Sequence, residues 1–79
     1  MNIYLIERKK EEFDWDTYIS AVVAAETESD ATTIHPNKDV KTLKGGDGWV
    51  RLPKLVKATL LGKAEDNIPR GVILARYIS

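Results

Sequence analysis

The pattern of apolar and polar positions divides the chain into four apolar segments separated by polar ones. Residues 2–6, 17–25, 55–61 and 71–78 are apolar and rich in β-branched side chains, a composition typical of strands. In residues 17–25 both alternating faces are largely apolar, which favours a central or covered strand. These segments predict a β-sheet of four strands.

A short helix is predicted between the second and third of these segments. Thr27 stands three positions before Asp30, a variant of the capping box in which the threonine hydroxyl accepts a hydrogen bond from the first helical turn. Ala31 and Ile34 are three positions apart, so they share the helix face that we expect to meet the sheet. Pro36 disfavours helical backbone just before it, so the helix is expected to run for about two to three turns.

The order of these elements predicts a single α+β domain over residues 1–79. It is a ββαββ arrangement: a four-stranded, mostly antiparallel sheet with one short helix packed on one face. Consecutive strands usually pair, so we expect the first beside the second and the third beside the fourth. The other face then meets water or a partner. Ile73, Ala75 and Tyr77 are its expected apolar side chains, so the state is a monomer or a homodimer.

The composition excludes several classes of protein. The chain has no cysteine and a single histidine, which excludes disulfide scaffolds, thiolate metal sites and thiol nucleophiles. No nucleophile, base and orienting group can be assembled around His35 from the sequence, so we predict no enzyme, no metal and no cofactor. No apolar run approaches the roughly 18 residues of a membrane helix, and the apolar start is too short for a signal peptide. We expect a cytoplasmic protein with no membrane association.

The formal net charge of zero hides a difference between the two halves of the chain. Residues 1–40 contain four Lys or Arg and nine Asp or Glu, a balance of −5, whereas residues 41–79 contain eight and three, a balance of +5. Folding can interleave the two halves, or it can leave an acidic and a basic surface that each suit a charged partner.

The acidic segment of residues 11–16 is the leading candidate for a partner-binding site. Its two aromatic side chains lie between carboxylates, and an aromatic anchor within a charged surround is a common composition of interaction hot spots. The same side chains can instead cover an edge of the sheet. The predicted partner-binding residues are Glu11, Glu12, Phe13, Asp14, Trp15 and Asp16.

The basic half contains an alternative site. Basic side chains around an aromatic platform are typical of proteins that bind single-stranded nucleic acid. Lysines on strand edges also occur simply because their charge discourages aggregation. The residues predicted for nucleic-acid binding are Trp49, Arg51, Lys54 and Lys57.

Several segments resemble a set of short uncharacterised phage and prophage proteins. They are AVVAAE at 21–26, IHP at 34–36, Trp49, and the tail segments 56–64 and 71–75. The resemblance implies an origin in a mobile element. Small phage proteins without catalytic motifs often act by binding a host machine, as anti-CRISPR proteins do.

The leading prediction is therefore a non-enzymatic, phage-type inhibitor of a host defence complex, similar to anti-CRISPR proteins. The acidic segment would dock on a basic surface that receives nucleic acid and would block binding of target DNA. The expected partner is a host protein or ribonucleoprotein complex such as a CRISPR effector, with no small-molecule substrate. The alternative is a small nucleic-acid-binding accessory protein that uses the basic C-terminal half.

Overall fold

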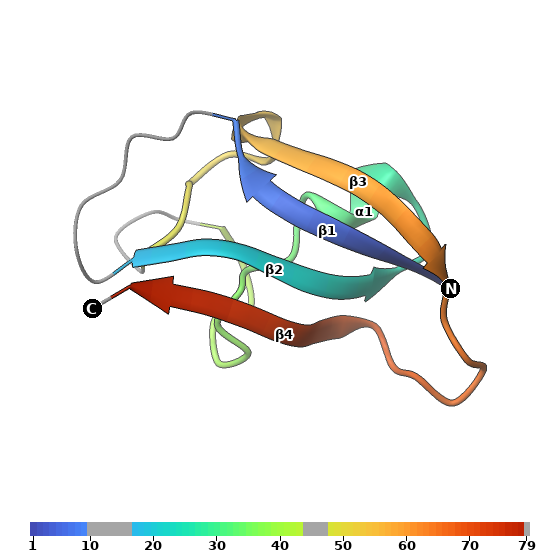
Figure 1. Cartoon of the computed structure of the whole chain (residues 1–79). Helices are drawn as coiled ribbons and strands as arrows, with labels where there is room; N and C mark the ends of the chain where they lie inside the picture. The colour runs from blue at the N-terminus through green and yellow to red at the C-terminus, as the bar shows by residue number, and fades with distance from the viewer. Residues whose placement is uncertain (10–16, 44–47, 79) are drawn as a thin grey trace.

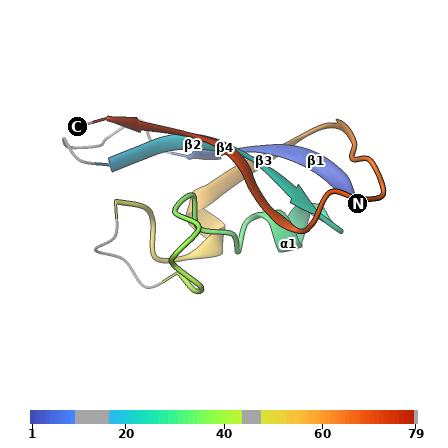
Figure 2. The same cartoon turned by 90° about the horizontal axis from the view of Figure 1, so that it is seen from below.

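The computed structural model describes residues 1–9, 17–43 and 48–78. In these ranges four strands form one antiparallel sheet, with the helix on one side of it (Figures 1 and 2), so the predicted α+β fold is confirmed. The elements are β1 (Asn2–Arg8), β2 (Thr17–Ala25), the helix α1 (Glu28–Ala31), the 3-10 turn η1 (Pro53–Leu55), β3 (Val56–Lys63) and β4 (Gly71–Ile78).

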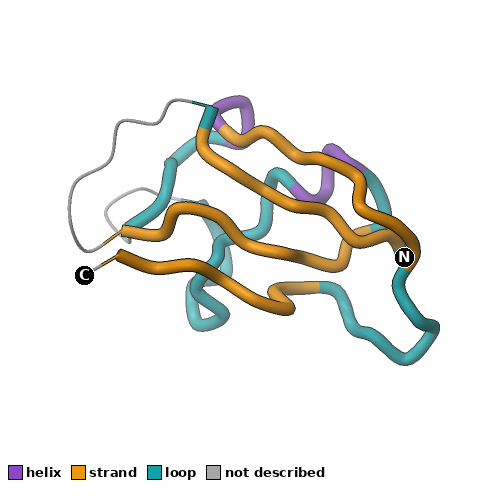
Figure 3. The backbone as a smooth tube through the Cα atoms, in the orientation of Figure 1, coloured by secondary structure: helices purple, strands orange, loops and turns teal. Residues whose placement is uncertain are grey.

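The strands lie in the order β3-β1-β2-β4 (Figures 1 and 3). The predicted pairing of β1 with β2 is confirmed, but the predicted pairing of β3 with β4 is wrong, because these strands form the two opposite edges. β1 and β2 have apolar side chains on both faces and take the centre of the sheet. β3 and β4 contain Lys57, Lys63 and Arg76, whose charges are tolerated at an edge.

The connection between the two edge strands passes the end of the sheet where β1 begins (Figure 1). The backbone N–H of Ala64 donates to the carbonyl of Met1 at 3.0 Å, which ties the start of this connection to the N-terminal residue. Residues 64–70 thus lead from one edge of the sheet to the other without passing over either face.

The core lies between the sheet and the helix side. Ile6 opposes Ala21 and Tyr4 opposes Val23 across the central pair of strands, and Ile6 and Val23 are fully buried. Burial of this apolar surface is the main source of stability in a domain of this size. The buried cluster is Tyr4, Ile6, Ala21, Val23, Ala25, Ala31, Ile34, Trp49 and Val56.

The helix begins where the sequence predicts and ends earlier. The Thr27 hydroxyl accepts a hydrogen bond from the backbone N–H of Asp30 at 3.0 Å, which confirms the predicted cap. The helix itself covers only Glu28–Ala31, so the expected length of two to three turns is wrong. The hydroxyl groups of Thr32 and Thr33 donate to backbone carbonyls of the helix at 2.6 and 2.7 Å, and such bonds compete with continued helical pairing.

A hydrogen-bond network joins the open ends of β1 and β2 to the segment that begins at Gly48. The Arg8 guanidinium donates to the carbonyls of Tyr18 and Gly48, both at 3.1 Å, and to the Thr17 hydroxyl. It also lies 5.4 Å from the centre of the Trp49 ring, a cation–π distance. Burial lowers the pKa of Arg8. The network fixes the Trp49 side of the core against the sheet.

Candidate functional site

The sheet face opposite α1 is an apolar surface that no described element covers. The helix and the turn η1 both lie on the other side of the sheet (Figure 2), and no described segment crosses this face. Val22 on β2 stands opposite both Leu5 on β1 and Leu74 on β4. Leu74 is 69% exposed. These three side chains form an apolar row across three strands.

The apolar row has apolar neighbours on one side and charged neighbours on the other. Toward the start of β1, Ile3 stands opposite Ala24 on the same face. Toward the end of β1, Glu7 stands opposite Lys57 on β3 and opposite Ser20 on β2. Ser20 in turn stands opposite Arg76 on β4, which completes this polar row. Two positive charges and one negative charge therefore border the apolar row at this end.

The structure corrects the predicted composition of this face on the last strand. Ala75 stands opposite Ala21 and packs against the core, so it belongs to the covered face. Tyr77 lies on that side too, with its ring centroid 4.8 Å from that of Tyr18. The register between β2 and β4 shifts by one residue at Ile73, which is 45% exposed, so Leu74 lies opposite Val22 on the uncovered face of β4.

The predicted partner-binding residues lie outside the described part of the chain. Nothing in the structure places their side chains, so an aromatic anchor among carboxylates stays a prediction. These residues are Glu11, Glu12, Phe13, Asp14, Trp15 and Asp16.

The predicted nucleic-acid site is not assembled as expected. Trp49 is 4% exposed and belongs to the core, so its ring is not available for stacking on a base, and that expectation is wrong. Arg51 and Lys54 are exposed beside the turn η1, whereas Lys57 is exposed on the uncovered sheet face. The three cations thus have no aromatic platform at Trp49.

The contacts of His35 indicate a role in packing. It is buried, and its Nδ1 accepts a hydrogen bond from the backbone N–H of Asn37 at 2.9 Å, so this nitrogen carries no proton. The ring meets Tyr18 edge-on, with centroids 6.1 Å apart. These contacts hold the segment after α1 against β2.

No family model, curated protein or solved structure matches this chain. Over the residues that the structure describes, no helix has the length and apolar content needed to cross a membrane. Over the same residues, histidine and acidic side chains form no group of three or more that is suited to a metal ion.

Proposed function

We propose that this protein is a non-catalytic binding protein that docks on another protein through the uncovered sheet face. The supporting observation is the row of Leu5, Val22 and Leu74, which ends in a leucine that is 69% exposed. Folded monomers rarely expose contiguous apolar patches larger than a few hundred Å² unless the patch is a binding surface.

The dimensions of the molecule suit a docking surface of ordinary size. Its principal extents are 36 × 21 × 19 Å, so a broad face measures at most 36 by 21 Å. A standard protein interface buries about 800 Å² on each partner, which is close to the area of such a face. A standard interface would therefore use most of one broad face.

The charges beside the apolar row favour a particular kind of partner. Lys57 and Arg76 outnumber Glu7 at the border, so an apolar surface bordered by acidic side chains is complementary. A second copy of this chain would bring the same excess of positive charge. We therefore favour a different protein over self-association.

The identity of the partner is proposed from the phage-like segments of the sequence. The partner is a component of a host defence complex, and the chain inhibits this complex by occupying its surface, as anti-CRISPR proteins do. A contact between the acidic segment of residues 11–16 and a basic nucleic-acid surface of the same complex is part of this proposal and rests on the sequence alone.

The test measures binding of target DNA by a panel of purified CRISPR effector complexes, with and without this protein. One variant, Leu74→Glu, places a charge in the apolar row, and a matched control, Leu60→Glu, places it at a leucine that is 60% exposed on β3 and shares a face with Tyr4. We expect the wild-type protein and the control to lower DNA binding by at least one complex, and Leu74→Glu to lose the effect.

Three results would contradict the proposal. If DNA binding is unchanged for every complex at saturating protein, the inhibitor function is wrong. If Leu74→Glu inhibits as well as the wild-type protein, the uncovered face is not the docking surface. If light scattering shows a wild-type dimer that Leu74→Glu dissociates, the face binds a second copy and not a different protein.

A further inference from the structure

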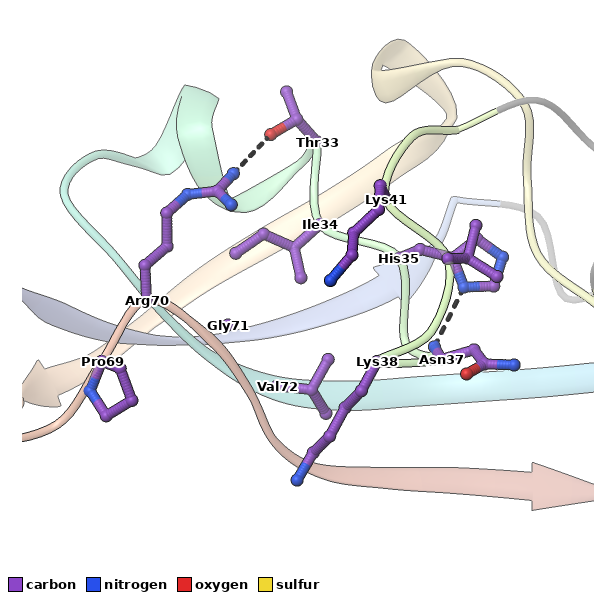
Figure 4. A pocket seen from close by; sticks show the side chains of 11 residues that line it. Thr33, Ile34, His35, Asn37, Lys38, Lys41, Pro69, Arg70, Gly71 and Val72 are labelled. Carbon is purple, nitrogen blue, oxygen red and sulfur yellow. Dashed lines mark hydrogen bonds between the residues drawn. The ribbon is translucent and has the colours of Figure 1, made fainter.

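A hollow lies between the segment that follows α1 and the first residues of β4 (Figure 4). Its volume is about 350 Å³, which is within the range of small-molecule pockets and far larger than a single water requires. This hollow is on the covered side of the sheet and is separate from the proposed docking face. It involves none of the binding residues predicted from the sequence.

The side chains that line the hollow have an excess of positive charge. Lys38, Lys41 and Arg70 line it, and no acidic residue is among the described residues that do. Two of these cations come from the segment after α1, and the third directly precedes β4. Residues that are distant in the sequence thus bring like charges to one opening, an arrangement that favours an anion.

Arg70 is already compensated by a carboxylate. Its Nη2 lies 2.8 Å from Asp30 Oδ1 and its Nε lies 2.9 Å from Asp30 Oδ2, which is a two-point ion pair. The guanidinium lowers the pKa of Asp30, so that carboxyl group stays ionised. Arg70 Nη2 also donates to the Thr33 hydroxyl at 3.0 Å. These bonds fix Arg70 as a wall of the hollow that links α1 to β4.

With Arg70 paired to Asp30, the remaining positive charge of the lining comes from Lys38 and Lys41. Neither has an ion pair with any described residue, and both are exposed. In Figure 4 the Lys41 side chain extends toward Ile34, and the Lys38 side chain extends along Val72. The hollow therefore combines apolar walls with two ammonium groups that form no ion pair with a described carboxylate.

We propose that this hollow binds a small phosphomonoester of about nucleotide size. A phosphomonoester carries about −1.5 to −2 charges near neutral pH, which matches two ammonium groups, whereas a monocarboxylate would leave one of them uncompensated. Lysine binds phosphate as a point charge and needs no planar geometry. The organic part of the ligand contacts Ile34 and Val72. The protein binds this ligand without converting it.

The experiment is an NMR titration of the isotope-labelled full chain with AMP, adenosine, inorganic phosphate and a single-stranded DNA oligonucleotide. We expect AMP to shift the backbone amides of Gly71 and Val72, and adenosine to bind at least about tenfold more weakly because it lacks the phosphate. Inorganic phosphate should shift the same amides at higher concentration, because it has the charge but lacks the apolar contacts.

Variants test whether the lysines are responsible. Lys38→Gln and Lys41→Gln should each weaken AMP binding by about tenfold, which is the loss of one charge-assisted contact. Lys63→Gln is the matched control, because Lys63 is an exposed lysine on β3, the opposite edge strand to β4. It should bind AMP within about twofold of the wild-type protein.

The proposal is overturned if AMP and adenosine bind equally, or if the two hollow variants behave like Lys63→Gln. An absence of shifts with millimolar AMP overturns it as well. If the oligonucleotide shifts the same amides at a lower concentration than AMP, with affinity that falls steeply with added salt, the phosphate comes from a nucleic-acid backbone, and the small-molecule assignment is wrong. None of these outcomes depends on Leu74 or on the defence complexes.

Discussion

Arg8 provides the sharpest test of how the core is held together. It is near the end of β1 and donates to two backbone carbonyls, one in β2 and one at Gly48, which directly precedes the buried Trp49. The substitution Arg8→Met keeps an unbranched apolar stem and removes every donor. It therefore tests the hydrogen bonds and the cation–π contact while preserving most of the packing.

The expected loss in the free energy of unfolding follows from the contacts of Arg8 that the substitution removes. A hydrogen bond with a charged partner contributes about 1.5–3 kcal/mol, and a cation–π contact about 0.5–1 kcal/mol at an exposed site. The carbonyl of Gly48 keeps two other donors, the Tyr18 backbone N–H and the Thr17 hydroxyl, both at 2.7 Å. The variant also avoids the desolvation that lowers the pKa of Arg8. We expect a net loss of about 2 kcal/mol.

Urea unfolding followed by circular dichroism measures this loss as the shift in midpoint multiplied by the slope. Arg76→Met is the control, because Arg76 is exposed on β4 and has no ion pair among the described residues. It should stay within about 0.5 kcal/mol of the wild-type protein. If Arg8→Met is as stable as Arg76→Met, the network does not hold the Gly48 segment against the sheet.

Two further predictions concern the core and the ion pair. Ile6→Val should lower the free energy of unfolding by about 0.5–1.5 kcal/mol in the same urea assay, because Ile6 is fully buried. The control Leu60→Val, at an exposed site, should change it by less than about 0.5 kcal/mol. Equal losses in the two variants would contradict the placement of Ile6 in the core. Arg70→Gln should cost less than about 1 kcal/mol at neutral pH, because solvent screens its bond with Asp30. Arg70 lowers the folded-state pKa of Asp30, so the stability from this ion pair is complete above the ordinary carboxyl pKa and is lost as the pH falls through the lowered pKa. The stabilities of the wild-type protein and Arg70→Gln should therefore converge in acid. A difference in stability that persists in acid would refute the ion pair as its cause.

The strand positions and the helix cap could be predicted because they depend on local patterns. Apolar, β-branched composition locates β1 and β2, and the pair Thr27 and Asp30 locates the start of α1. The order of the strands could not be predicted by the rule that neighbours in sequence pair. Charge content does not decide it either, because the central strand β1 contains Glu7 and Arg8 whereas the edge strand β4 contains only Arg76, so the order depends on tertiary packing.

The sequence predicts that one face of the sheet is uncovered, but it places Ala75 and Tyr77 of β4 on the wrong face. Alternation correctly groups Ala75 with Tyr77, but the register shift beside Ile73 decides which side of the sheet that group faces. Such a bulge has no signature in these residues. The burial of Trp49 cannot be predicted from the sequence for a related reason: basic residues lie near it in the chain, and only tertiary contacts show that its ring packs in the core.

The order of the strands has a consequence for the biosynthesis of the protein. The inner strands, β1 and β2, leave the ribosome first, and the strands that flank them, β3 and β4, are made later. Until residues 56–78 emerge, the nascent hairpin has two unpaired backbone edges, and an isolated hairpin is marginally stable in water. The rate at which translation delivers the second half of the chain therefore sets how long the apolar β2 stays open to other chains.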